Sequence, residues 1–279
     1  MPGARRTRKP AENDAALAGA VRRLKQLLLL LGVLLILGVI GLIVWVQRGQ
    51  SGQKLLEAVE KNQTTEAARL LQSGIDVNTV NEEGVTPLML ASYHGFKPLA
   101  EMLLQHGAKV DARNSRRETA LRLAGSSHPD TVKLLLEHGA DPNVRDFYGK
   151  TLLVSVCEAG ADHDAETLRL LLDHGADPNI GGDNGSPLIY AINIGLHGDA
   201  DIVRLLLQHG ANPDAKDRAD SSALICAVDK HNPEIVKALI AAKAGLNATD
   251  SLGRTALRLA DDNQLTQIAA MLKRAGARE

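Results

Sequence analysis

The chain has 279 residues, of which 44% are hydrophobic and 23% charged, and it contains two cysteines and six aromatic residues. This composition excludes collagen-like chains, disulfide-stabilised small domains and most wholly disordered chains, and it predicts a core of Leu, Ile, Val and Ala. The formal net charge of -1 hides an asymmetry, because residues 1–26 hold seven Lys or Arg against two acidic residues, leaving 25 against 31 in the rest.

The first predicted element is a membrane-spanning helix at residues 27–46, which follows a basic tail at residues 1–26. The segment LLLLLGVLLILGVIGLIVWV has no charged residue. A helix of that length rises about 30 Å, the hydrocarbon thickness of a bilayer. A secretory signal peptide would have a shorter apolar region and a cleavage site of small residues, which is missing after Val46. A buried helix of a soluble protein rarely lacks a polar face over this length. The segment therefore predicts that the lipid bilayer is one partner of the chain.

Flanking charge predicts the orientation of this helix. Because basic residues concentrate before the span, the positive-inside rule places the amino-terminal tail in the cytoplasm and the rest of the chain across the membrane. Trp45 lies at the far end of the span, where indole rings prefer the interface. Residues 47–53 are read as a short polar tether. The Ala-, Leu- and Arg-rich sequence suggests a bacterium, so the expected location is a single-pass protein of the inner membrane with its body in the periplasm.

Residues 54–279 repeat one pattern. Its end reads LLQSGIDVN, LLQHGAKVD, LLLEHGADPN, LLLDHGADPN and LLLQHGANPD in successive copies, and two further copies carry LIAAKAGLN and LKRAGA. Its beginning reads Thr or Ser, then any residue, then Leu, in phase with those ends. The glycines of the first five ends stand at positions 74, 107, 139, 175 and 210, which are 33, 32, 36 and 35 residues apart.

This pattern resembles the ankyrin repeat, whose period is near 33 residues and whose signature contains T-P-L-x-x-A. The resemblance covers residues 54–279. It implies an all-α solenoid of helix-turn-helix units with β-hairpin fingers, here preceded by one transmembrane helix, in which each unit contacts only its neighbours. The predicted repeats are residues 54–80, 81–113, 114–145, 146–180, 181–216, 217–249 and 250–279.

Local chemistry accounts for the same pattern. Thr or Ser before each first helix predicts a side-chain cap that accepts a backbone N–H, and a following proline suits the first turn. The glycine that ends each second helix predicts a left-handed turn. Lys243 occupies that glycine position in one copy, so we expect either strain or an altered turn there. Cys157 and Cys226 occupy apolar positions two repeats apart, and this spacing predicts buried, unpaired thiols.

The nine histidines form two rows. Four precede the terminating glycine, where an imidazole can bind the last carbonyls of a helix. The other five lie in the turns between paired helices, and two of those turns are about three residues longer than the repeat requires. Imidazole and carboxylate groups from these neighbouring turns could bind a divalent metal. The candidate ligands are His163, Asp162, Asp164, His197, Asp199 and Asp201. The alternative is that these residues cap helices or face solvent.

Aromatic residues indicate a different site. Phe147 and Tyr148 lie at the tip of a predicted finger, where exposed rings often anchor a partner. Tyr93 and Phe96 are expected to lie partly in the core. The resemblance implies that fingertips and first helices form a concave recognition face. The residues predicted to bind a partner are Phe147, Tyr148, Arg116, Arg117, Glu82 and Glu83. The alternative is that the two rings pack against adjacent fingers.

The function that these features predict is a membrane-anchored, non-catalytic scaffold that binds a protein partner and uses no cofactor. The sequence contains no phosphate-binding glycine loop, no GxSxG and no HExxH, which leaves an enzyme without a recognisable motif. A metal-holding or metal-responsive periplasmic protein is the main alternative. Nucleic-acid binding is not expected, because the body is acidic and has no basic stripe.

Overall fold

A computed structural model describes residues 34, 35, 37–39, 51–125, 127–194 and 198–278, with the backbone alone at residues 161–164. The chain divides into two compact units, Met1–Ser51 and Gly52–Glu279. The basic tail and most of the span predicted at residues 27–46 lie outside the described residues. Within the described ranges, no helix is long and apolar enough to cross a membrane. Residues 51–53, predicted as part of the tether, already belong to a helix that runs to residue 60.

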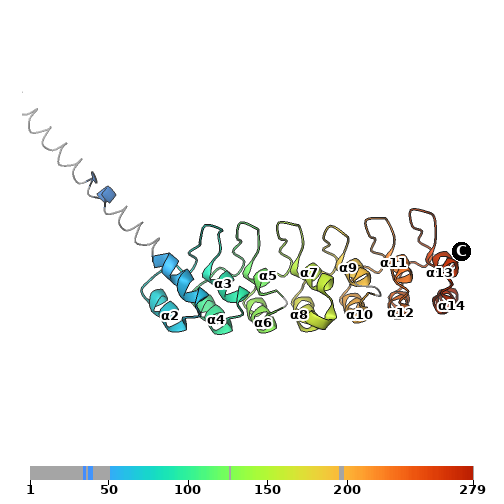
Figure 1. The fold of residues 1–279 in the computed structure, drawn as a ribbon, viewed down its shortest axis with the longest axis horizontal. Helices are drawn as coiled ribbons and strands as arrows, with labels where there is room; N and C mark the ends of the chain where they lie inside the picture. Colours follow the sequence, from blue (N-terminus) through green and yellow to red (C-terminus); the bar gives the residue numbers. More distant parts are fainter. Residues whose placement is uncertain (1–33, 36, 40–50, 126, 195–197, 279) are drawn as a thin grey trace, which may run out of the picture. The chain divides into compact units, whose positions relative to one another are not determined.

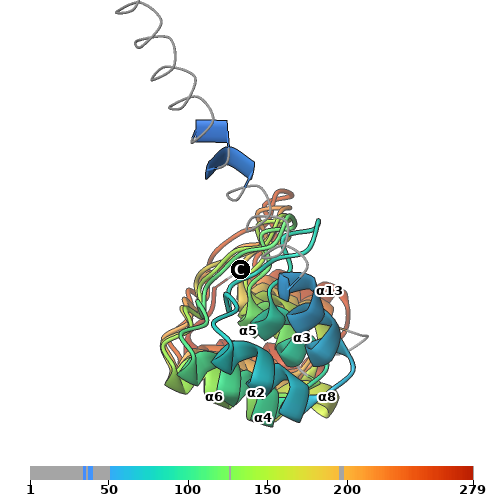
Figure 2. The ribbon, with the colours of Figure 1, turned by 90° about the vertical axis from the view of Figure 1, so that its left-hand side faces the viewer.

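The second unit is a stack of paired helices in two layers, with loops that project from one side of the stack (Figures 1 and 2). One layer contains helical residues 52–60 followed by α3 (Pro87–Tyr93), α5 (Ala120–Ala124), α7 (Leu152–Ala159), α9 (Pro187–Asn193), α11 (Ala223–Asp229) and α13 (Ala256–Asp262). The other layer contains α2 (Thr64–Gln72), α4 (Lys97–Gln105), α6 (Pro129–Glu137), α8 (Ala161–Asp173), α10 (Ala200–Gln208), α12 (Pro233–Ala241) and α14 (Thr266–Ala275). Most helices pack against their own partner and against neighbours in the stack, as α9 does against α10, α7 and α11.

Side-chain caps begin the helices of the first layer. At α3, the Thr86 hydroxyl accepts the Met89 N–H at 3.2 Å, which satisfies one of the free donors of the first turn. The predicted cap is wrong at Ser186, whose buried hydroxyl has no hydrogen-bond partner among the described residues. It is confirmed at Thr86, Thr119, Thr151, Ser222 and Thr255.

The second helices end in left-handed turns, as predicted. The His106 ring N–H (Nδ1) lies 2.9 Å from the Met102 carbonyl oxygen, and Gly107 follows with φ +85°. Lys243 replaces this glycine but keeps the turn, with φ +63° and its N–H 3.0 Å from the Ile240 oxygen. Strain at Lys243 is therefore confirmed and an altered turn is wrong, because the surrounding repeat holds the lysine in a conformation that favours glycine.

The asparagine or aspartate that follows these turns joins consecutive repeats. Asn143 accepts the Asp177 N–H at 2.8 Å and donates to the Gly175 oxygen at 3.1 Å. Because this side chain bonds backbone groups that a helix end leaves unpaired, it fixes the spacing of the stack. Equivalent bonds to the next repeat come from Asn78, Asp111, Asn179, Asp214 and Asn247.

The fingers are turns, so the predicted β-hairpins are wrong. The described residues contain three isolated bridges and no strand. A side chain at the base of the finger accepts the N–H groups that a second strand would have used. Asp146, for example, accepts from Tyr148 and Lys150 N–H, both at 2.9 Å. The residues with this role are Asn81, Asn114, Asp146, Asp217 and Asp250.

The core is built from Leu, Ile, Val and Ala, and it runs through the stack from Leu55 to Leu272. Cys157 and Cys226 are buried and unpaired, as predicted. Burial raises the pKa of the Cys226 thiol to about 12 and raises that of Cys157 as well. Both thiols are therefore protonated near neutral pH, which makes them weak nucleophiles.

Candidate protein-binding surface

The predicted partner-binding residues occupy the tips of three consecutive fingers. We define the first finger as residues 79–85, the second as 112–118 and the third as 144–150. The exposed side chains at their tips are Glu82, Glu83, Arg116, Arg117, Phe147 and Tyr148.

The two aromatic rings of the third finger face solvent. Phe147 is 69% exposed and Tyr148 is 72% exposed, so the alternative that they pack against adjacent fingers is wrong. The rings meet edge to face, with centroids 5.7 Å apart. An exposed aromatic pair is apolar surface that a partner can bury.

Backbone hydrogen bonds hold the three tips together. The Ser115 N–H donates to the Glu83 oxygen at 2.9 Å, and the Phe147 N–H donates to the Arg116 oxygen at 3.0 Å. Because both bonds cross between fingers, the acidic, basic and aromatic tips lie in consecutive positions along one edge of the stack (Figure 1).

A buried ion pair anchors the third finger to the helices. Asp146, which is 5% exposed, accepts from the Arg122 guanidinium at 2.7 Å. Arg122 also donates to the Thr151 carbonyl and to the Ser155 hydroxyl, so one side chain joins α5, the third finger and α7. A bond to a charged, desolvated partner stabilises more than a neutral one. The aromatic tip is thus attached to a rigid base.

A groove of about 300 Å³ lies between the first two fingers and helices α3 and α5. Leu90, Tyr93 and Leu123 line it, together with Glu83 and Arg116 from the predicted set. Tyr93 is 60% exposed, so its predicted place in the core is wrong.

Sequence reasoning missed this groove, although α3 contains a signal for it. The buried face of α3 holds Leu88, Met89 and Ala91, whereas Leu90 and Tyr93 are three residues apart on another face. A short helix with a second apolar face is expected to have a second partner. Phe96 does pack against the core, as predicted, and stacks on His94 with ring centroids 5.1 Å apart.

The predicted metal ligands are only partly within the described structure. Asp199 caps α10 by accepting two backbone N–H groups, and Asp201 binds Arg204 at 2.6 Å. The predicted long turn at residues 161–164 is wrong for the backbone, because α8 begins at Ala161. No group of three or more potential ligands occurs among the described side chains. The side chains of Asp162, His163 and Asp164 and the whole of His197 lie outside them, so a metal site there stays a prediction.

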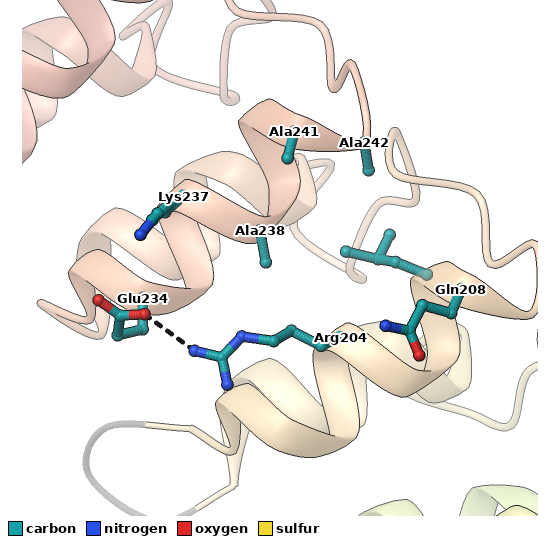
Figure 3. Close-up of a pocket in the computed structure, with 8 residues that line it drawn as sticks. Arg204, Gln208, Glu234, Lys237, Ala238, Ala241 and Ala242 are labelled. Atoms are coloured by element: carbon teal, nitrogen blue, oxygen red, sulfur yellow. Dashed lines mark hydrogen bonds and ion pairs between the residues drawn. The ribbon is translucent and has the colours of Figure 1, made fainter.

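A second groove, of about 380 Å³, lies between α10 and α12 (Figure 3). Ala238, Ala241 and Ala242 form one wall, and Arg204 reaches across the groove to Glu234 at 2.9 Å. The Arg204 guanidinium binds Asp201 on its own helix and Glu234 on α12, so its charge is paired within the chain and ties two repeats together. Lys237 in the same groove forms no ion pair among the described residues.

The chain matches a family model described as Ankyrin repeats (3 copies) at residues 55–146, 145–217 and 196–278. It is 28% identical to the ankyrin repeat domain of Bcl-3, a unique member of the IkappaB protein family, over 78% of this chain and 97% of that chain, with a TM-score of 0.68. The human ASB11 ankyrin repeat domain is 24% identical over 81% of this chain and 98% of that chain, with a TM-score of 0.60, a likeness that shows the fold alone.

Proposed function

The chain belongs to the ankyrin repeat family, and we propose that it is a non-catalytic scaffold that binds a protein partner through its first three fingers and the groove behind them. Ankyrin repeat domains are generally protein–protein interaction modules. The observation that carries the proposal for this chain is the exposed Phe147–Tyr148 pair, which is fixed to a rigid base in the finger that follows the two fingers of the Tyr93 groove.

Partner binding is expected at these rings because exposed aromatic side chains lose unfavourable hydration when a partner covers them. The rings are held in place before binding by Asp146 and by the bond to the second finger, so little further ordering is needed. The thiols are protonated and buried, and Arg122 and Arg204 form ion pairs with Asp146 and Glu234 within the chain. These groups support fold stability and provide no activated nucleophile.

A pull-down from the source cells tests this site. Replacing Phe147 and Tyr148 together by alanine is expected to lower partner capture about tenfold or more, because truncating a buried aromatic anchor typically costs 2 kcal/mol or more. The matched control is Leu252→Ala, since Leu252 is 73% exposed at the corresponding position of the last finger. Circular dichroism should show that both variants keep the helix content of the parent. Equal capture by the double variant and the parent would show that the third finger is not the binding site.

The proposal also places the scaffold at a membrane, anchored by residues 27–46 with the repeats on the far side from a cytoplasmic tail. Its support is the uncharged twenty-residue segment and the excess of basic residues before it. The repeats would then meet partners of the bacterial periplasm close to the bilayer surface.

Reporter fusions at the carboxyl end test this topology. Alkaline phosphatase fused after residue 279 is expected to be active and green fluorescent protein at the same point dark, because the first matures only outside the cytoplasm and the second only inside it. Moving the basic residues of 1–26 to the polar segment that follows the span should weaken this preference. A fluorescent fusion with an inactive phosphatase fusion would reverse the assignment.

A further inference from the structure

We infer that the second and third fingers select an acidic, extended segment of a partner protein, with a carboxylate cluster on the fingers and an apolar side chain in the Tyr93 groove. This inference rests on the proposed function and specifies the chemistry of the partner. Four arginines carry it, all on these two fingers and all exposed: Arg113, Arg116, Arg117 and Arg145.

These arginines have no acidic partner within the described part of the chain. The nearby ion pairs use other cations, since Asp146 binds Arg122 and Glu158 binds Lys150. Arg145 donates only to the backbone oxygens of Gly149 and Gly181. Glu118 accepts from the side-chain amide of Asn114, at 2.8 Å. The patch is therefore a concentration of unpaired positive charge on a body that is otherwise acidic.

Backbone strain at Arg117 is an independent observation. Arg117 has φ +61°, a left-handed conformation that disfavours any side chain with a Cβ. The corresponding position of the first, third and last fingers is a glycine, at Gly84, Gly149 and Gly253, with φ of +74°, +73° and +74°. The same turn therefore forms without strain when glycine is present. Asp220 holds the same position at φ +63° in another finger, so the strain alone does not mark a site, and at Arg117 it places a guanidinium at an exposed tip.

The shape of the charge distribution favours a short acidic protein segment over a long polyanion. Glu82 and Glu83 flank the patch on one side, and Asp183 lies in the next finger on the other side. A nucleic acid strand or an anionic lipid surface would extend over Glu82 and Glu83 and be repelled. A peptide two fingers wide would meet the arginines, and its apolar side chains could contact Phe147, Tyr148 and the Tyr93 groove, which Glu83 and Glu118 also line.

The test uses the full chain and a short labelled peptide of alternating glutamate and leucine, followed by fluorescence anisotropy. Arg117→Gly is expected to weaken peptide binding about three- to tenfold while raising the urea midpoint of unfolding, because it removes a charge and the strain together. The control is Asp220→Gly, which changes the same left-handed position, at φ +63°, in another finger and also removes an exposed ion pair with Lys216, and it should leave peptide binding unchanged. Arg116 does not have a left-handed backbone. Arg116→Gln should therefore weaken peptide binding with little change in the urea midpoint.

Several outcomes would overturn the inference. The first is equal affinity of the parent, Arg117→Gly and Arg116→Gln for the acidic peptide. The second is equal affinity of the parent for the matching lysine–leucine peptide. The third is that the arginine substitutions weaken binding of an oligonucleotide, or of phosphatidylglycerol vesicles relative to phosphatidylcholine vesicles, more than they weaken binding of the acidic peptide. Failure here is distinguishable from failure of the proposed function. If Phe147 and Tyr148 are needed for partner capture but these arginines do not discriminate acidic peptides, the scaffold role stands and only the partner chemistry is wrong.

Discussion

Leu188→Ala is expected to lower the free energy of unfolding by about 3–4 kcal/mol, as for other leucines deleted from a fully packed site. Leu188 is 0% exposed in α9, which packs between α7 and α11 inside the stack. Because each repeat is stabilised mainly by its neighbours, weakening an interior one should also uncouple the repeats on its two sides. Urea denaturation should then show two transitions where the parent shows one.

The matched control is Leu272→Ala. Leu272 is also 0% exposed but lies in α14, which packs against α12 and α13 at one end of the stack. The lost packing is similar in kind, but α14 has no repeat beyond it in the described structure. Hydrogen exchange should therefore detect early opening of α14 while the amides of the interior helices stay protected. A single cooperative transition for both variants, with equal midpoints, would contradict the nearest-neighbour account.

Asp146→Ala is expected to cost about 2–3 kcal/mol, because it removes the partner of Arg122 and the acceptor for two backbone N–H groups. This expected loss is below that of a fully buried pair, since the Arg122 side chain is 21% exposed and can regain water. The third finger should also lose order, so partner capture should fall with stability. Urea denaturation and amide exchange at Phe147 and Tyr148 measure the two effects.

Asp217→Ala separates the ion pair from the turn. Asp217 accepts the N–H groups of Ala219 and Ser221 in the same way as Asp146 does in its finger, but no arginine binds it among the described ion pairs. Its loss should cost about 1.5 kcal/mol, less than the loss of Asp146, because it removes hydrogen bonds to a charged group but no ion pair. Losses of the same size at Asp146 and Asp217 would show that Arg122 contributes little.

Local chemistry made much of the fold predictable from the sequence. The threonine caps, the terminal glycines and the apolar spacing act within a few residues, so the pattern predicts the helices with little help from the rest of the chain. Lys243 shows the opposite case. Its own preference is against the left-handed turn, and the packing of its repeat overrides it.

The fingertips of the candidate site could be predicted from the sequence, whereas the Tyr93 groove could not. Phe147 and Tyr148 depart from the polar residues expected in a finger, which makes them visible in the sequence. Tyr93 follows an apolar spacing that is compatible with a core, but it lies off the face of α3 that holds Leu88, Met89 and Ala91. The finger conformation was misjudged because an asparagine or aspartate at its base satisfies the backbone without a strand.

The bonds between consecutive fingers have a consequence for the speed of recognition. Because the Ser115 and Phe147 N–H groups already donate to the preceding finger, the first three fingers keep their spacing in the free protein. A partner would meet a template that needs no slow rearrangement, so its association rate should depend on diffusion and charge steering, and the lifetime of the complex should distinguish one partner from another.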